Sequence, residues 1–169
     1  MEALDFGCGT GLVALRLAPL VRRLTGADGS EAMLGVLRAK AAAQGIVNVQ
    51  TRQVAVGETP DLGGPYDLVV SSMTLHHVQD VAALVAGLAR AVLPGGFLCL
   101  ADLDSEDGSF HSDNTGVFHF GLDRDTVAGL LEGAGFADVG RTTASTVEKP
   151  GPEGMRGYSV FLVWGRKQG

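Results

Sequence analysis

The chain has 169 residues, which is the length of one domain of about 100–200 residues. Hydrophobic residues make up 46% of the chain and charged residues 19%, a balance that excludes a disordered or fibrous protein. The formal net charge is −6. That charge argues against a protein held on nucleic acid, because phosphate contacts need a basic face.

Strand and helix patterns alternate along the first hundred residues, which predicts an α/β sheet. A glycine-rich turn, Gly7-Cys8-Gly9-Thr10-Gly11, follows the first strand, and a helical pattern then runs to about Pro19. Ser30 is the expected N-cap of a second helix with an apolar face. The fourth strand is apolar enough to lie at the centre of a parallel sheet. The strands predicted in this half of the chain are 3–6, 24–27, 47–54 and 66–71.

The second half continues the alternation and then breaks it. A helix is predicted over about 80–92, ended by Leu93-Pro94-Gly95-Gly96, with a strand at 97–101, a helix near 124–134 and an extended run at 138–147. The segment 149–157 is too short for a crossover helix, so it is predicted to be a hairpin loop. The last strand, 158–164, is then antiparallel to its predecessor. The predicted fold class is α/β: a doubly wound, Rossmann-like, mostly parallel sheet with an antiparallel last strand.

We expect a single domain over 1–169, made of a core (1–102), an acidic lid-like segment (103–121) and a C-terminal helix with an antiparallel hairpin (122–169). Residues 101–125 hold seven acids and one arginine. This stretch therefore carries a charge of −6, which equals the net charge of the whole chain. With Phe110, Phe118 and Phe120, the segment 103–121 is interpreted as a lid that favours a neutral or cationic ligand over an anionic one. The alternative is a solvated acidic loop with anchoring rings. The acidic run does not fit an EF-hand loop, because its glycine, Gly108, comes one place late, and no metal site is predicted.

Cys8 and Cys99 are the chain's two cysteines, and both are predicted to be buried free thiols in a reducing compartment. No segment offers about 18 uncharged apolar residues for a membrane span. The start of the chain lacks the basic residues of a signal peptide. These features predict a soluble, cytoplasmic protein.

The glycine-rich turn between the first strand and the first helix is typical of a nucleotide site, because glycine lets backbone approach a ligand closely. Its spacing is G-x-G-x-G, with Asp5 two residues before the first glycine. A dinucleotide turn reads G-x-G-x-x-G. Asp28, at the end of the second strand, can accept hydrogen bonds from ribose hydroxyls. The pattern therefore favours a ligand that binds near a carboxylate over one that needs a pyrophosphate groove.

With these residues the chain resembles the class I S-adenosylmethionine-dependent methyltransferases, of the small-molecule type that includes ubiquinone and menaquinone biosynthesis methyltransferases. Four motifs in order carry the resemblance: Leu4 to Gly11, Gly26 to Leu34, Tyr66 to Val78, and Leu93-Pro94-Gly95-Gly96. They cover about the first hundred residues. The antiparallel last strand is also similar to that family's seventh strand.

The resemblance implies a set of cofactor-binding residues. Asp5 and the backbone of Gly7, Cys8 and Gly9 would hold the methionine end, and Asp28 would bind the ribose. Gly29 and Met33 would border the adenine, with Ala55 after the third strand. Ser71 would face the cofactor's amino group through its backbone.

Two departures from the family pattern matter. Family members usually carry an acid just after the third strand, whereas this chain has Val54-Ala55-Val56-Gly57. The bond to the adenine amino group would then come from backbone or Glu58, or be missing. The chain also lacks the usual N-terminal helices before the first strand, and an uncovered sheet face there would favour pairing of two chains.

The function that the resemblance implies is methyl transfer from S-adenosylmethionine to a small-molecule acceptor, by a monomer or homodimer without nucleic acid or membrane partners. No catalytic residue is assigned, because a general base is needed only for an acceptor that must lose a proton. His77 is expected to bond nearby backbone, and His76, His111 and His119 are weaker candidates for acceptor contact. The alternatives are an S-adenosylmethionine-binding domain or truncated chain without turnover and, less favoured, an NAD-dependent oxidoreductase.

Overall fold

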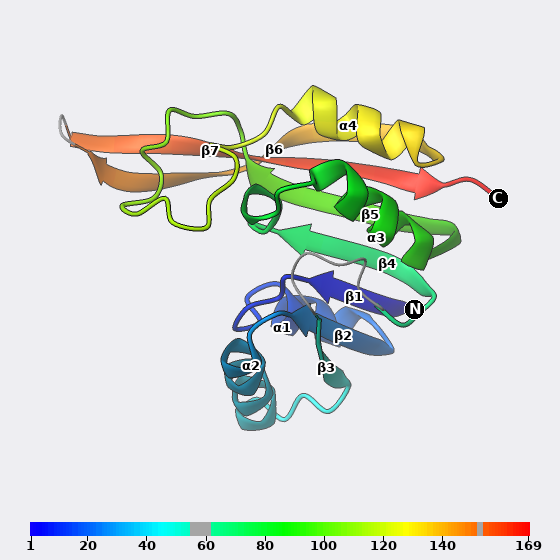
Figure 1. Ribbon diagram of the computed structural model, residues 1–169. Helices are drawn as coiled ribbons and strands as arrows, with labels where there is room; N and C mark the ends of the chain where they lie inside the picture. The colour runs from blue at the N-terminus through cyan, green and yellow to red at the C-terminus, as the bar shows by residue number, and fades with distance from the viewer. Residues whose placement is uncertain (55–61, 152–153) are drawn as a thin grey trace.

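The computed structural model describes residues 1–54, 62–151 and 154–169. These residues form one seven-stranded sheet with the strand order β3-β2-β1-β4-β5-β7-β6 (Figure 1). β7 is antiparallel to both of its neighbours, β5 and β6, and the remaining strand pairs are parallel. The predicted fold class is confirmed. The strands are β1 Glu2–Phe6, β2 Arg23–Asp28, β3 Val49–Gln53, β4 Tyr66–Ser72, β5 Val92–Leu103, β6 Phe136–Gly151 and β7 Gly154–Lys167.

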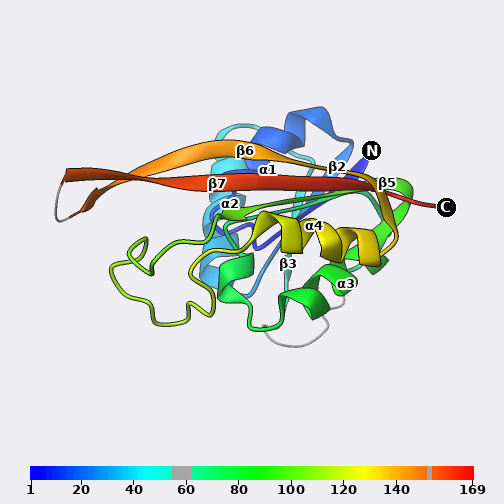
Figure 2. The same ribbon diagram turned by 90° about the horizontal axis from the view of Figure 1, so that it is seen from above.

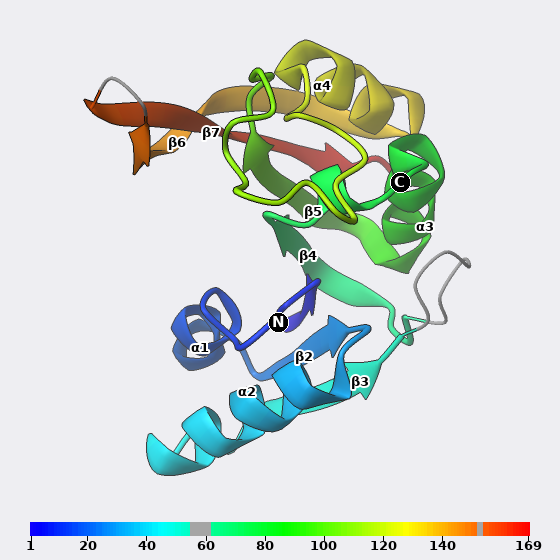
Figure 3. The same ribbon diagram turned by 60° about the vertical axis from the view of Figure 1, so that its left-hand side comes forward.

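The helices cover both faces of the sheet. α1 and α2 pack on one face near β2 and β3, and α3 and α4 pack on the other face near β5, β6 and β7 (Figures 2 and 3). Their bounds are α1 Ala14–Leu17, α2 Glu31–Ala43, α3 Val81–Ala91 and α4 Arg124–Gly133, with 3-10 turns at Ala18–Leu20 and Leu75–His77. None of the helices in the described residues is long and apolar enough to cross a bilayer.

Each face has its own buried apolar cluster. On the α3 and α4 face, Leu4, Val69, Leu88 and Leu98 belong to one cluster, and all four are 0% exposed. On the opposite face the cluster consists of Cys8, Ala14, Leu24, Leu34 and Leu37. β1 contributes to the α3 and α4 face through Leu4, and the glycine turn that follows it contributes Cys8 to the other face. The end of β1 is therefore fixed from both sides.

The first helix is shorter than predicted. Gly7, Gly9 and Gly11 all have positive φ angles of 70°, 51° and 89°, so the turn occupies the chain through Gly11. Pro19 lies in the 3-10 turn at the other end, where its ring limits the backbone. A single helical turn, α1, remains, and Leu12 and Leu20 are each 72% exposed. Ser30 does cap α2, because its hydroxyl accepts a hydrogen bond from the Met33 N–H at 3.3 Å.

Three strands, β5, β6 and β7, extend well beyond their predicted bounds. β5 begins at Val92, where α3 ends, so residues 93–96 are already strand rather than a linker. The predicted hairpin loop over 149–157 is also wrong in extent, because the ladder pairs Lys149 with Arg156 and Gly151 with Gly154. Glycine and proline mark a turn in the sequence but not its length, and here the paired backbone reaches almost to the tip. The hairpin extends past the rest of the sheet (Figure 1).

Candidate functional site

The loops after β1 and β2 meet at the carboxyl edge of the sheet. The Gly7 and Cys8 N–H groups both donate to the Ala27 carbonyl, at 2.8 and 3.1 Å. The Gly9 N–H donates to Asp28 Oδ2 at 2.8 Å, and the Ser30 N–H donates to Asp28 Oδ1 at 2.9 Å. These two bonds orient the Asp28 side chain. Because a carboxylate has about four acceptor positions, Asp28 can still accept hydrogen bonds from a ligand.

Two glycines of the turn have different roles. A Cβ on Gly7 would lie 2.1 Å from Thr74 Oγ1, so Gly7 lets the turn pack against the chain that follows β4. A Cβ on Gly9 would meet no atom of the described residues within 4 Å. Gly9 nevertheless has a positive φ of 51° and lines a cavity. It therefore presents bare backbone to that cavity, which is what close approach by a ligand requires.

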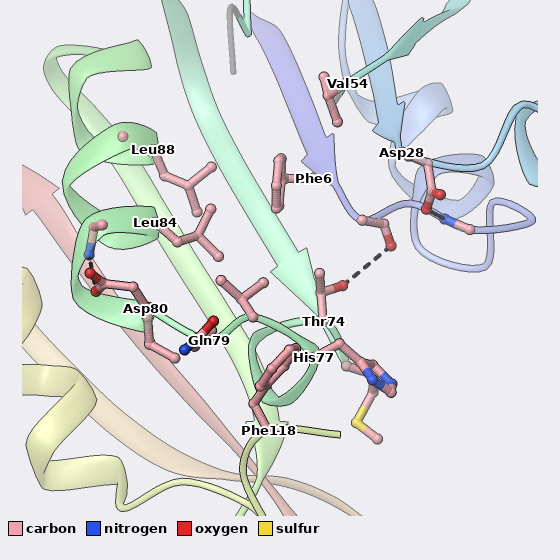
Figure 4. A pocket seen from close by; sticks show the side chains of 18 of the residues that line it. Phe6, Asp28, Val54, Thr74, His77, Gln79, Asp80, Leu84, Leu88 and Phe118 are labelled. Atoms are coloured by element: carbon pink, nitrogen blue, oxygen red, sulfur yellow. Dashed lines mark hydrogen bonds between the residues drawn. The ribbon is translucent and has the colours of Figure 1, made fainter. Parts of the chain in front are cut away.

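The cavity has a volume of about 1270 Å³ and runs from the β1 and β2 loops to α3 (Figure 4). Phe6, Val54, Leu84 and Leu88 form an apolar wall, and Asp28 lies at one side of the cavity (Figure 4). Ligand pockets usually have volumes of about 300–1000 Å³, so this one has room for a cofactor together with a second small molecule. It lies outside the carboxyl ends of the strands, where open α/β sheets bind ligands.

Asp5 is the most perturbed acid at the site. Its side chain is buried, and its Oδ2 atom has no hydrogen-bond partner among the described residues. Burial raises the pKa of Asp5 to about 7, with a further increase from the nearby Asp28 charge and an opposing hydrogen bond from the Ala14 backbone. An unpaired buried carboxyl oxygen is suited to a cationic ligand, which would replace the water that burial removed.

Cys8 lies in the same turn, but its thiol is unreactive. Burial, together with the charges of Asp5 and Asp28, raises the pKa of Cys8 to about 12. Nucleophilic and metal-binding cysteines need the thiolate form. Both cysteines are free, Cys8 buried as predicted and Cys99 only partly so.

The predicted cofactor residues divide into three groups. Gly7, Gly9, Asp28, Gly29 and Met33 line the cavity. Asp5, Cys8 and Ser71 are buried beside it and are not part of its lining in the described chain; the Ser71 hydroxyl donates to the Phe6 carbonyl at 2.9 Å. Ala55 and Glu58 lie outside the described residues.

A further part of the lining was missed from the sequence. The residues directly after β4 line the cavity: Met73, Thr74, Val78, Gln79 and Asp80. Their position after a central parallel strand was a usable signal, since the carboxyl ends of such strands share one edge. Asp80 also caps α3, because its Oδ1 accepts from the Ala83 N–H at 2.9 Å.

The histidines gather around the turn that follows β4. His77 Nδ1 donates to the Gly116 carbonyl at 2.8 Å, which agrees with the expected backbone bond, and His77 also lines the cavity. His76 is buried, with Nδ1 2.6 Å from Asp102 Oδ1. His111 Nε2 is 3.2 Å from His76 Nε2, and His119 Nε2 donates to the Val78 carbonyl at 3.0 Å. Burial and the charges of His76 and His77 lower the pKa of His111.

The seven acids of residues 101–125 form hydrogen bonds or ion pairs with other groups of the chain. None of them lines the cavity that the described residues form. Arg124, Arg156 and Arg141 form ion pairs with three of them: Asp104, Asp107 and Asp125. Asp102 bonds His76, and backbone or hydroxyl groups occupy Glu106, Asp113 and Asp123. Each of the seven carboxylates therefore has a partner within the chain. From residues 103–121, Phe118 reaches the lining.

Comparison with known sequences agrees with this geometry. Residues 3–96, more than half of the chain, match the profile of the family described as methyltransferase domain. The ubiquinone biosynthesis O-methyltransferase of Rhizobium leguminosarum bv. trifolii (strain WSM2304) is 36% identical over 104 residues, which cover 62% of this chain and 41% of that protein. An uncharacterized methyltransferase of Schizosaccharomyces pombe (strain 972) is 32% identical over 136 residues, covering 72% and 48%. The chain thus spans less than half the length of these curated relatives.

Solved structures share the whole fold. The YcgJ protein from Bacillus subtilis is similar with a TM-score of 0.78 at 17% identity, covering 99% of this chain and 92% of that chain. Phosphoethanolamine N-methyltransferase 2 of Haemonchus contortus, in complex with S-adenosyl-L-methionine, gives a TM-score of 0.75 at 15% identity, covering 100% and 49%. The resemblance seen in the sequence motifs is confirmed. The chain belongs to the methyltransferase domain family and has the fold of the class I S-adenosylmethionine-dependent methyltransferases.

Proposed function

We propose that this chain binds S-adenosylmethionine in the cavity and transfers its methyl group to a small-molecule acceptor. The observation that carries the proposal is the bare Gly9 backbone beside the oriented Asp28 carboxylate, where the β1 and β2 loops meet. Family membership supports the same reaction. The name of the Rhizobium relative, an O-methyltransferase, favours an oxygen on the acceptor.

The described residues fit the cofactor in three places. The backbone of Gly7 and Gly9, with the unpaired oxygen of Asp5 behind them, suits the cationic methionine end. Asp28 retains acceptor capacity for the two ribose hydroxyls. Gly29 and Met33 line the cavity beside Asp28, at a position suited to the adenine.

When bound, the cofactor supplies an activated methyl group on a sulfonium. The chain's own residues then hold the acceptor in line and keep water out, and orientation of this kind contributes about 7–11 kcal/mol to catalysis. Phe6, Leu84, Leu88 and Phe118 provide apolar surface for the acceptor. His77 and Gln79 provide polar groups on the same side of the cavity (Figure 4).

The first test is calorimetric titration with S-adenosylhomocysteine, comparing Gly9→Ala with Gly45→Ala. Both glycines have positive φ, 51° and 67°, and an added Cβ would meet no described atom within 4 Å of either. Both variants therefore carry the same backbone strain of about 1–2 kcal/mol, but Gly9 lines the cavity. We expect Gly9→Ala to weaken binding at least tenfold and Gly45→Ala to leave it unchanged.

Two results contradict the cofactor assignment: equal affinity in both variants, or tighter binding of NAD than of S-adenosylhomocysteine by the unaltered chain. Turnover is tested separately by following S-adenosylhomocysteine release from S-adenosylmethionine with a panel of small acceptors that carry a hydroxyl group. Stoichiometric binding without release of product would identify a cofactor-binding domain and refute the methyl-transfer half of the proposal.

A further inference from the structure

We propose that His76, His77 and His111 form a binding site for one divalent transition metal ion of the zinc type, at the border of the cavity. One ring nitrogen from each histidine lies within 4.8 Å of the others. His76 and His77 come from the turn after β4, and His111 comes from the segment 103–121. The sequence analysis predicted no metal site. A histidine pair followed by a third histidine 34 residues later is not a recognisable ligand spacing.

The spacing of two ligand atoms already fits a metal. His76 Nε2 and His111 Nε2 are 3.2 Å apart. Two imidazoles on a tetrahedral zinc, at Zn–N distances of about 2.0–2.1 Å, place their nitrogens about 3.3–3.4 Å apart. Closing this edge of the tetrahedron would need a movement of only a few tenths of an ångström.

The surroundings of His76 give an independent reason. Its Nδ1–H donates to Asp102 Oδ1 at 2.6 Å, and both side chains are almost fully buried. Asp102 is itself held by the Leu75 and Leu103 N–H groups at 2.8 and 2.7 Å. A carboxylate behind the ring is the usual partner of a metal-binding histidine, because it fixes the tautomer and leaves the Nε2 lone pair for the metal.

His77 is prepared in the same way by a carbonyl. Its Nδ1–H donates to Gly116 O at 2.8 Å, which leaves the Nε2 lone pair available. His111 is fixed by its neighbour Phe110, a buried ring that contacts His111 edge-on at 4.8 Å between ring centroids. Tyr158 and the Lys149 ammonium hold Phe110 in place, so the third ligand is anchored to the β6–β7 hairpin.

The ligand set selects the kind of ion. Three imidazole nitrogens suit zinc, copper, nickel or iron, whereas calcium and magnesium prefer oxygen ligands. Three protein ligands leave one position of a tetrahedral zinc open. Because His77 itself lines the cavity, the ion would lie at the border of the space where we place the methyl acceptor.

A metal-free arrangement could produce the same distance, since one proton shared between His76 and His111 also brings two nitrogens to 3.2 Å. The experiment that separates the two uses the full chain without a histidine tag, stripped of metal by a chelator and then titrated with Zn²⁺ in a calorimeter. Titration with Co²⁺ reports the geometry, because tetrahedral nitrogen coordination gives strong visible absorption. Neither readout depends on methyl transfer or on cofactor binding.

We expect one Zn²⁺ per chain and a tetrahedral Co²⁺ spectrum. His111→Ala and His77→Ala should each weaken Zn²⁺ binding at least tenfold. His119→Ala is the matched control, because its imidazole bonds the Val78 carbonyl and lies outside the cluster; it should bind Zn²⁺ as the unaltered chain does. Circular dichroism verifies that each variant is folded.

The proposal is overturned if the unaltered chain takes up no stoichiometric Zn²⁺, which would leave the shared proton as the explanation. It is equally overturned if folded His111→Ala and His77→Ala both retain full affinity, or if His119→Ala loses as much affinity as they do. A failure of S-adenosylhomocysteine to bind would contradict the proposed function and leave this result unaffected.

Discussion

Asp5 shows how a single residue at this site balances stability against ligand binding. Its carboxyl group is buried under the glycine turn, and one of its oxygens has no partner in the described chain. Because burial disfavours the charged form, the pKa of Asp5 is raised from 3.8 to about 7. The folded chain therefore holds at neutral pH a partly ionised group that water would solvate better. A cationic ligand would relieve that cost.

A pH dependence follows. Between about pH 4 and pH 7 the unfolded chain has an ionised Asp5 while the folded chain keeps the proton, so the folded state binds more protons and stability falls as pH rises. At the usual 1.36 kcal/mol per pKa unit, the loss is at most about 4 kcal/mol. Asp5→Asn cannot ionise, so its free energy of unfolding should fall less between pH 5 and pH 8. Urea unfolding across that range measures it.

Asp138→Asn serves as the control, because it removes an exposed carboxylate far along the chain, at a positive φ of 52° that asparagine tolerates. Its stability profile should parallel that of the unaltered chain. If Asp5→Asn and the unaltered chain have the same slope between pH 5 and pH 8, the account of Asp5 as a buried, unpaired acid is wrong.

At the scale of single residues, the sequence motifs predicted that Gly7, Gly9 and Asp28 lie at the binding site. Their positions follow from the conformation of the glycine turn and from the order of the strands. The motif could not reveal that Thr74 packs against Gly7, so closely that a Cβ on Gly7 would lie 2.1 Å from Thr74 Oγ1. That contact depends on β1 and β4 being neighbours, which links residues 67 positions apart. For Met73 and Thr74 the usable signal is their position directly after a predicted central strand, whereas their individual contacts depend on sheet pairing.

Among the larger parts of the fold, the segment 103–121 has contacts that its sequence did not predict. The sequence showed its charge and its aromatic rings, which favoured a lid with an acidic face. The partners of those acids lie far away in the chain: Arg156 on β7 bonds Asp107 at 2.7 Å, and Arg124 at the start of α4 pairs with Asp104. Composition cannot show such pairings. The segment is a structural cover whose Phe118 reaches the cavity.

Two acids of this region should differ sharply in their effect on stability. Asp102 is 0% exposed and accepts from His76 and from the Leu75 and Leu103 backbone. Removing it leaves buried donors unsatisfied, so Asp102→Ala should lower the free energy of unfolding by about 3–5 kcal/mol. Asp107→Ala breaks an exposed ion pair with Arg156 and should have little effect.

Urea unfolding of both variants, stripped of metal, measures the difference. Equal destabilisation would mean that the surface pair contributes as much as the buried network. That result would contradict the assignment of Asp102 as the group that fixes the turn after β4.

For the whole molecule, the alternation of strand and helix patterns predicted the mostly parallel sheet, and the shortness of segment 149–157 predicted that the last strand is antiparallel. The extent of the β6–β7 hairpin was not predictable, because it depends on contacts across the ladder. Gly140 is an example: a Cβ there would lie 2.3 Å from the Trp164 ring, so glycine is needed to let the indole lie across β6. The short α1 was not predictable either, because the turn that contains the positive-φ Gly11 continues through residues 12 and 13 before the helix begins at Ala14.

The central claim is that the β1 and β2 loops hold S-adenosylmethionine, and a crystal structure of the chain grown with S-adenosylhomocysteine tests it most directly. In that crystal the ribose hydroxyls should lie within hydrogen-bond distance of the Asp28 carboxylate, and the amino-acid end should lie over Gly7 and Gly9. The sulfur should face the space near His77 and Phe118. Two results would contradict this claim: S-adenosylhomocysteine bound elsewhere on the chain, or an empty cavity in crystals of a chain that calorimetry shows to be saturated with the ligand.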